Sequence, residues 1–208
     1  DNLKRAFISA EDKNFFEHIG IDLSSIARAT LQNLYNYIFT DDNNRLIGAS
    51  TITQQLVKNL FLDSEKTFIR KIKEIIIAIK LERKISKEKI LEMYLNEIYL
   101  GRGAYGIVAA SERYFNKRLL DLTVEEYAFL AALPKAPSRY NPYKDINLAK
   151  YRRDLVLRNL FENNYISFQE YNDLKLEKIL LKKNKKIFLE DSQYYIEDIR
   201  KKIIEVLG

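Results

Sequence analysis

The chain of 208 residues contains no cysteine, so it can form neither a disulfide nor a thiolate metal site. Its one histidine, His18, excludes a metal site built from several histidines and leaves a single candidate for a histidine base. Glycine occurs six times and proline three times, which favours long helices with few tight turns. No run of about 18 apolar residues is present, so no segment is expected to span a bilayer.

What the sequence does contain indicates a folded, basic protein. Hydrophobic residues make up 47% of the chain, enough for one substantial core or for two small lobes around a cleft. The net charge of +6 favours an anionic partner: nucleic acid, phosphate groups or an acidic membrane surface. Because the chain begins at Asp1 and not at methionine, we expect a domain cut from a longer protein, with any signal or membrane anchor outside it.

The stretch from Gly48 to Asn59 reads as a helix with an unusual polar face. Thr51 followed by Gln54 fits a capping box that begins the helix. Amides and hydroxyls dominate the polar face and can both donate and accept hydrogen bonds, which suits a hydroxyl-rich or phosphate-bearing ligand. An ordinary amphipathic helix explains the spacing equally well. The polar face comprises Thr51, Gln54, Gln55, Lys58 and Asn59, and the opposite face includes Ile52, Leu56 and Leu60.

Two adjacent carboxylates, Glu11 and Asp12, lie between an alanine-rich apolar segment and the pair Phe15 and Phe16. A carboxylate beside apolar rings loses solvation, and its pKa rises toward the range of a general acid or base. A loop whose acidic residues cap the next helix is the alternative. For His18 we favour a structural hydrogen bond over a catalytic role.

Two further predicted helices each allow two interpretations of where their side chains lie. The helix expected over 24–39 ends in an apolar, aromatic stretch from Leu34 to Phe39, which suits either the core or a membrane interface. The helix expected over 65–84, with Ser64 as its cap, has an apolar stripe predicted to be buried. Its cations surround Glu74 and suit either a surface ion-pair ladder or a diphosphate site. The stripe comprises Ile69, Ile72, Ile76 and Ile79, broadened by Ile75 and Leu81, and the cations are Lys66, Arg70, Lys71 and Lys73.

The remainder of the sequence also reads as helical. Helices are expected over 87–99, 105–115, 123–133, 147–163, 167–178 and 192–207, with a solvated linker over 181–186. Gly101, Gly103 and Gly106 predict a close turn, with backbone that a ligand can approach. Pro134, Pro137 and Pro142 mark a structured loop.

Five stretches together resemble the peptidoglycan glycosyltransferase domain, glycosyltransferase family 51. These are Glu11-Asp12-x-x-Phe15-x-x-His18-x-Gly20, Gly48-x-Ser50-Thr51-Ile52-Thr53-Gln54-Gln55-x-x-Lys58-Asn59, Arg70-Lys71-x-x-Glu74, Lys87-x-x-Ile90-Leu91-Glu92-x-Tyr94-Leu95-Asn96 and Ala132-Leu133-Pro134-Lys135-Ala136-Pro137. Five such motifs in this order are specific for the family, and the resemblance covers about residues 1–142.

This resemblance implies an all-α, lysozyme-like fold over 1–208, with a large lobe, a small membrane-facing lobe at about 25–50 and a cleft between them. It implies polymerisation of lipid II onto a growing lipid-linked glycan, with inversion and release of undecaprenyl diphosphate. The implied location is the outer face of the bacterial cytoplasmic membrane, with an anionic membrane surface as partner. A transpeptidase domain follows in the bifunctional members of the family, and nucleic acid is not an expected partner.

The resemblance also implies roles for individual residues. Glu11 becomes the base that takes the proton from the acceptor hydroxyl, and Glu74 the second catalytic carboxylate. Lys66 stands where members of the family often have arginine, which keeps the charge but loses the bidentate fork. A divalent cation, Mg²⁺ or Mn²⁺, near Glu11 or Glu74 is compatible but is not required. The expected substrate-binding residues are Asp12, Ser50, Thr51, Gln54, Gln55, Lys58, Asn59, Lys66, Arg70 and Lys71.

Two other functions remain open from the sequence. A lysozyme-like hydrolase or lytic transglycosylase shares the helical fold and a catalytic glutamate, but has no need of cations beside a second carboxylate. A basic helical module that binds nucleic acid or anionic lipid explains neither the Glu11–Asp12 pair nor the glutamine-rich face. The salt dependence of DNA binding distinguishes such a module from the two kinds of enzyme.

Overall fold

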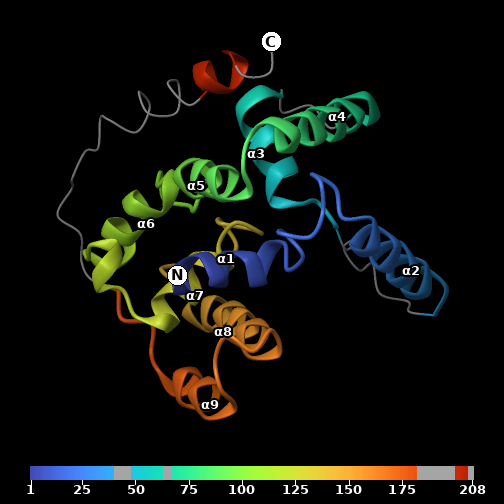
Figure 1. Cartoon of the computed structure of the whole chain (residues 1–208). Helices are drawn as coiled ribbons and strands as arrows, with labels where there is room; N and C mark the ends of the chain where they lie inside the picture. Colours follow the sequence, from blue (N-terminus) through green and yellow to red (C-terminus); the bar gives the residue numbers. More distant parts are fainter. Residues whose placement is uncertain (40–47, 63–66, 182–199, 206–208) are drawn as a thin grey trace.

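The computed structural model describes residues 1–39, 48–62, 67–181 and 200–205 (Figure 1). Within these ranges the protein is helical, with no strand beyond one isolated bridge between Tyr99 and Tyr105, so the all-α prediction is confirmed there. None of the described helices is long and apolar enough to cross a bilayer. The elements are α1 Asn2–Glu11, α2 Leu23–Phe39, α3 Ile52–Phe61, α4 Phe68–Lys84, α5 Lys87–Glu97, α6 Gly106–Phe115, the 3₁₀ turn η1 Leu119–Asp121, α7 Val124–Ala132, α8 Ile146–Glu162 and α9 Phe168–Leu176.

The core is organised around α7, which is apolar on nearly all sides. Every residue from Ala128 to Leu133 is at most 1% exposed, as expected for a helix that is enclosed by its neighbours. Helices α1 and α8 pack against α7, and α3 packs against both α4 and α5. Figure 1 shows α1, α7 and α8 together, with α3 and α4 to one side of them. The last turn of α1 therefore lies between these two groups of helices.

Helix α2 stands apart from this core (Figure 1), and only its Ala29 is buried. The aromatic and apolar residues of its second half face solvent, with Tyr37 87% exposed and Phe39 70% exposed. The interpretation of this segment as core is therefore wrong. A continuous exposed apolar surface of this kind marks a contact with a protein or a membrane.

Helix α4 corrects a second prediction. Ser64 lies outside the described residues, and the helix begins at Phe68 after Thr67, whose side chain accepts from the Arg70 N–H at 3.1 Å. Half of the stripe predicted to be buried is exposed: 67% for Ile69, 43% for Ile72 and 49% for Ile76. Within the stripe, only Leu81 is fully buried as predicted. The buried residues are Glu74, Ala78 and Leu81.

The reason is that α4 packs mainly against α3, and the face turned toward α3 is the one that carries Glu74. The isoleucine-rich face has no covering helix among the described residues, and Phe68 extends it at 81% exposure. Hydrophobic spacing identified the apolar face of α4 correctly, but did not show which face meets the core.

Several helix boundaries follow the predicted signals. Thr51 and Gln54 form the complete capping box of α3, and the Thr123 N–H donates to Glu126 Oε2 at 3.0 Å at the start of α7. The predicted glycine turn joins α5 to α6, with positive φ at its three glycines. Most of the predicted linker over 181–186 and most of the predicted helix over 192–207 lie outside the described residues. The part of this helix that the structure describes, 200–205, is helical.

Gly20 brings the loop after α1 against α4. Its φ is +93°, and a Cβ at this position would lie 2.8 Å from the carbonyl carbon of Ala78. Only glycine permits both the backbone conformation and this approach. Through Gly20, the position of the loop is set by the backbone of α4.

Glu97, at the end of α5, is a buried carboxyl whose Oε2 has no hydrogen-bond partner among the described residues. Desolvation raises its pKa to about 7 from an ordinary value of 4.5. The folded protein thus favours the protonated form. The stability that this preference provides is complete below pH 4.5 and is lost as the pH rises through 7.

We therefore expect Glu97→Gln to raise the free energy of unfolding by about 1–2 kcal/mol at pH 8 and to change it little at pH 4.5. Urea unfolding at both pH values measures this difference. Glu92→Gln, at an exposed position of the same helix, is the matched control. A gain of the same size at both pH values would contradict the assignment of the raised pKa to Glu97.

Candidate active site

Glu11 is the last residue of α1, at the point where this helix meets α3. Its Oε2 accepts a hydrogen bond from Gln55 Nε2 at 3.0 Å. Desolvation raises the pKa of Glu11, while the Gln55 hydrogen bond and the positive charges of Arg152 and Lys135 oppose the rise and Asp12 adds to it. A carboxyl whose pKa is raised in this way is suited to accept a proton near neutral pH.

Asp12, the next residue, is occupied within the protein. Its Oδ2 accepts from the Ile52 N–H at 2.9 Å, and both oxygens lie within 3.0 Å of His18 Nε2. The second ring nitrogen of His18 accepts from the Gly20 N–H at 3.2 Å. The predicted structural hydrogen bonds of His18 are therefore present. A direct substrate contact for Asp12 stays a prediction, and the geometry favours a role in joining the loop to α3.

The polar face of α3 is divided between interior and solvent. Thr51 and Gln54 are at most 2% exposed, and their polar groups serve the capping box and a hydrogen bond from Thr51 Oγ1 to the Gly20 carbonyl at 2.7 Å. Gln55 meets Glu11, while Lys58 and Asn59 are exposed. The capping box leaves the side chains of Gln55, Lys58 and Asn59 free to meet a ligand, and Thr51 also lines the pocket described below.

The second carboxylate, Glu74, is buried between two cations. Arg70 Nη1 lies 3.3 Å from Glu74 Oε2, and Lys71 Nζ pairs with Oε1. Lys71 also donates to Ser50 Oγ at 2.9 Å, which connects α4 to the segment before α3. Since the Glu74 side chain is 3% exposed, the cluster is no solvated surface ladder. Lys66 lies outside the described residues.

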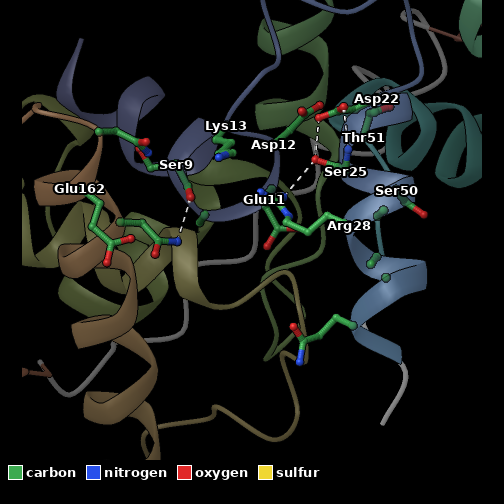
Figure 2. A pocket seen from close by; sticks show the side chains of 17 residues that line it. Ser9, Glu11, Asp12, Lys13, Asp22, Ser25, Arg28, Ser50, Thr51 and Glu162 are labelled. Atoms are coloured by element: carbon green, nitrogen blue, oxygen red, sulfur yellow. Dashed lines mark hydrogen bonds between the residues drawn. The ribbon is translucent and has the colours of Figure 1, made fainter. Parts of the chain in front are cut away.

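A pocket of about 600 Å³ adjoins Glu11. Figure 2 shows Glu11 between Ser9 and Glu162 on one side and Arg28 and Ser50 on the other. Its walls come from the end of α1, from α2, from the segment before α3 and from the end of α8. The lining residues are Ser9, Ala10, Glu11, Asp12, Lys13, Asp22, Ser25, Arg28, Ala29, Gln32, Gly48, Ala49, Ser50, Thr51, Asn159, Glu162 and Asn163.

Several of these residues were not predicted from the sequence. Lys13 and Arg28 add positive charge to the pocket. Asn159 and Asn163 have the i, i+4 spacing of one helix face, and their amides donate to the carbonyl and hydroxyl of Ser9 at 2.9 and 3.2 Å. That spacing was a usable signal for α8, whereas nothing in the sequence placed Arg28 beside Glu11.

Asp22 caps α2 at the edge of the pocket. Its Oδ1 accepts from the Ser25 N–H at 2.9 Å. Desolvation acts to raise the pKa of Asp22, but hydrogen bonds from Ser24, Ser25 and Asn14 outweigh it and hold the pKa well below the usual range. Asp22 therefore stays ionised at every physiological pH, and its pKa is shifted in the opposite direction to that of Glu11.

The described residues contain no group of three or more His, Asp or Glu side chains placed to hold a metal ion. The oxygens of Glu74 meet Arg70 and Lys71, and those of Asp12 meet His18 and a backbone N–H. These carboxylates do not fit a protein-held Mg²⁺ or Mn²⁺ without rearrangement, so we derive no chemical step through a metal.

Comparisons with known proteins agree on one family. The model of the transglycosylase family matches residues 1–161. Penicillin-binding protein 1A of Rickettsia prowazekii is 47% identical over 207 residues, 100% of this chain and 26% of that protein. Penicillin-binding protein 1F of Bacillus subtilis is 52% identical over 168 residues, 81% of this chain and 23% of that protein. The chain thus spans about a quarter of the length of these curated relatives. The crystal structure of penicillin-binding protein 1A from Haemophilus influenzae, 34% identical, matches with a TM-score of 0.47 and covers 73% of this chain and 20% of that one.

Proposed function

Because the chain belongs to the transglycosylase family, we propose that it is a peptidoglycan glycosyltransferase domain that acts in bacterial cell-wall synthesis. Membership of this family also supports the lysozyme-like, all-α class expected from the sequence. The proposed reaction is polymerisation of lipid II into β-1,4-linked glycan strands, with inversion and release of undecaprenyl diphosphate. The observation that carries the proposal is Glu11, a desolvated carboxyl in a pocket whose rim connects to the cationic pair on α4.

Glu11 is the proposed general base. The acceptor 4-hydroxyl gives its proton to the Glu11 carboxylate as its oxygen attacks the anomeric carbon of the donor sugar. The new C–O bond forms on one face while the bond to the diphosphate breaks on the other, so the configuration inverts. Gln55 holds one oxygen of Glu11, and none of the described residues hydrogen-bonds to Oε1. That oxygen is available to the acceptor.

The leaving diphosphate carries the charge released by the bond that breaks. Arg70 and Lys71 surround Glu74 at the α4 side of the site, and Ser50 connects Lys71 to the pocket rim. Fixed cations at the position where negative charge develops lower the barrier with little reorganisation. Lys58, exposed on α3, is the next candidate contact. A peptidoglycan-cleaving hydrolase would need a bound water in place of the acceptor sugar, and would have no use for these cations.

The direct test is incubation with lipid II followed by separation of the products on a gel. We expect a ladder of glycan polymers. Failure of the wild-type protein to extend lipid II in detergent and in vesicles would overturn the proposed function. Release of shorter fragments from preformed peptidoglycan would favour the hydrolase instead.

We further propose that the domain works on the outer face of the cytoplasmic membrane, with α2 in contact with the lipid. Both helices expose apolar and aromatic side chains, as in segments that lie at a membrane interface. These are Leu31, Leu34, Tyr35, Tyr37, Ile38 and Phe39 on α2 and Phe68, Ile69, Ile72 and Ile76 on α4. The net charge of +6 adds attraction to anionic headgroups. Since the relatives are about four times as long as this chain, we also propose that a transpeptidase domain accompanies it in the full protein.

We expect the double substitution Tyr37→Asp/Phe39→Asp to lower flotation with anionic liposomes about tenfold or more, because burial of either ring contributes about 1.5–3 kcal/mol. Co-flotation with vesicles of phosphatidylglycerol measures the effect. The control is Leu120→Asp, which removes a side chain that is 90% exposed on η1, away from α2. Unchanged binding of the double variant would exclude α2 as the contact.

A further inference from the structure

Tyr94 is a fully buried side chain of α5 next to the proposed base. Its ring meets that of Phe7 edge-on, with the centroids 6.4 Å apart. Its hydroxyl donates to Gln55 Oε1 at 3.4 Å. The other end of the same amide, Nε2, donates to Glu11 Oε2 at 3.0 Å. Three side chains from three helices therefore form one chain of hydrogen bonds that ends on Glu11.

We propose that Tyr94 is a positioning residue for the base, which acts through Gln55 by keeping the amide nitrogen, and not the amide oxygen, turned toward Glu11. This inference rests on the proposed role of Glu11 in the transfer reaction. An amide has a donor end and an acceptor end, and a half-turn about its last torsion exchanges them. With the oxygen toward Glu11, a carbonyl and a carboxylate would repel one another.

The orientation matters because Glu11 is held in a balance of opposed influences. Desolvation raises the pKa of Glu11 most strongly, and Asp12 raises it further. Gln55 on α3, Arg152 on α8 and Lys135 after α7 lower it. A change that weakens the Gln55 hydrogen bond leaves desolvation less opposed, so the pKa of Glu11 rises. A base must be ionised to act, and the acid limb of the rate profile then moves to higher pH.

The buried hydroxyl of Tyr94 strengthens the donor on Gln55. A hydrogen bond to Oε1 polarises the amide and makes its N–H groups better donors, as in other hydrogen-bond chains inside proteins. Burial and the nearby carboxylates Glu11 and Asp12 raise the pKa of Tyr94 well above 10, so the phenol keeps its proton at any working pH. Tyr94 thus remains a donor while Glu11 gains and loses a proton.

The test uses Tyr94→Phe, which keeps the ring and removes only the hydroxyl, and Gln55→Met, which keeps the length of the side chain without its amide. For Tyr94→Phe we expect kcat with lipid II to fall about three- to tenfold with KM unchanged, the effect of one neutral hydrogen bond. The acid limb should move up by about half a pH unit. Gln55→Met should shift it further, and the double variant should equal Gln55→Met, because Tyr94 acts only through the amide.

Tyr114→Phe is the matched control. Tyr114 is equally buried, and its hydroxyl donates to the Leu100 carbonyl at 2.8 Å without contact with Glu11, Gln55 or Glu74. This variant loses stability comparably but should keep the acid limb of the wild type. An unshifted limb in Tyr94→Phe, with a loss of stability like that of Tyr114→Phe, would overturn the proposal.

A second readout separates this inference from the proposed function. The ¹³C resonance of the Glu11 carboxyl, assigned by its loss in Glu11→Gln, gives the pKa without any substrate. We expect this pKa to rise in Tyr94→Phe and in the double variant with Gln55→Met. The double variant also removes the amide oxygen that Tyr94→Phe alone leaves without its donor, so it serves if the single variant does not fold. An inactive wild type would overturn the proposed function alone, whereas an unchanged Glu11 titration would overturn the role of Tyr94.

Discussion

Glu11→Gln is expected to abolish polymerisation of lipid II, with a loss of rate of about 10²- to 10⁴-fold, because the amide cannot take the proton from the acceptor hydroxyl. Gel separation of the glycan products measures this loss. The wild-type rate should fall at acidic pH with an apparent pKa above the ordinary 4.5 of a glutamate, since desolvation raises the pKa of Glu11. A variant that retains polymer synthesis would refute the assignment of Glu11 as the base.

The same substitution should leave the fold intact. A carboxyl whose pKa is raised in the folded state contributes most stability below its unfolded pKa of about 4.5 and loses that contribution as the pH rises. At higher pH the wild type must bury a charged carboxylate, and a neutral glutamine removes the free-energy cost of desolvating that charge. We therefore expect Glu11→Gln to melt no lower than the wild type at pH 8, by circular dichroism. Glu17→Gln, at an exposed position of the loop that follows α1, should change neither activity nor stability.

Lys71→Ala is expected to lower the polymerisation rate by about 10²-fold, the typical cost of one group that stabilises charge in a transition state. Lys71 pairs with Glu74 and donates to Ser50, so its removal takes away a cation and also the connection between α4 and the pocket rim. Initial rates with fluorescent lipid II measure the effect. The loss should be mainly in kcat, because the charge on the diphosphate grows as its bond breaks.

Lys80→Ala provides the comparison for Lys71→Ala. Lys80 is exposed on the same helix and carries the same charge, so both variants have the same net charge and the same change in helix propensity. Only Lys71 contacts Glu74 and Ser50. Equal losses in the two variants would show that the general positive charge of the domain matters and that the proposed diphosphate site is misplaced.

Local signals in the sequence predicted much of this structure. The capping box at Thr51 fixed the start of α3, and the Glu11–Asp12 pair beside apolar residues indicated a desolvated carboxyl. Both depend on neighbours within a few residues. The role of Gln55 was only partly visible. The sequence placed Gln54 correctly in the cap, but assigned both glutamines to a ligand surface, whereas the Gln55 amide donates to Glu11.

The remainder depended on contacts that no local pattern encodes. The isoleucine face of α4 was assigned to the core because it is apolar, yet tertiary packing buried the face with Glu74 instead. Arg152 and Lys135 influence Glu11 from α8 and from the loop after α7, more than 120 residues along the chain. Tyr94 lay within a recognised motif, but only the packing of α5 on α3 shows that its hydroxyl meets an amide.

The contacts that form the pocket have a consequence for the order in which the chain folds. Glu11 meets Gln55 across 44 positions of sequence, and the Ser9 carbonyl meets Asn159 across 150. Contacts at such separations form late, after the local helices, because long loops must close first. On the ribosome, α1 therefore waits for α8 to be synthesised. We expect a fragment that ends at residue 142, although it carries every motif, to leave the pocket without one of its walls.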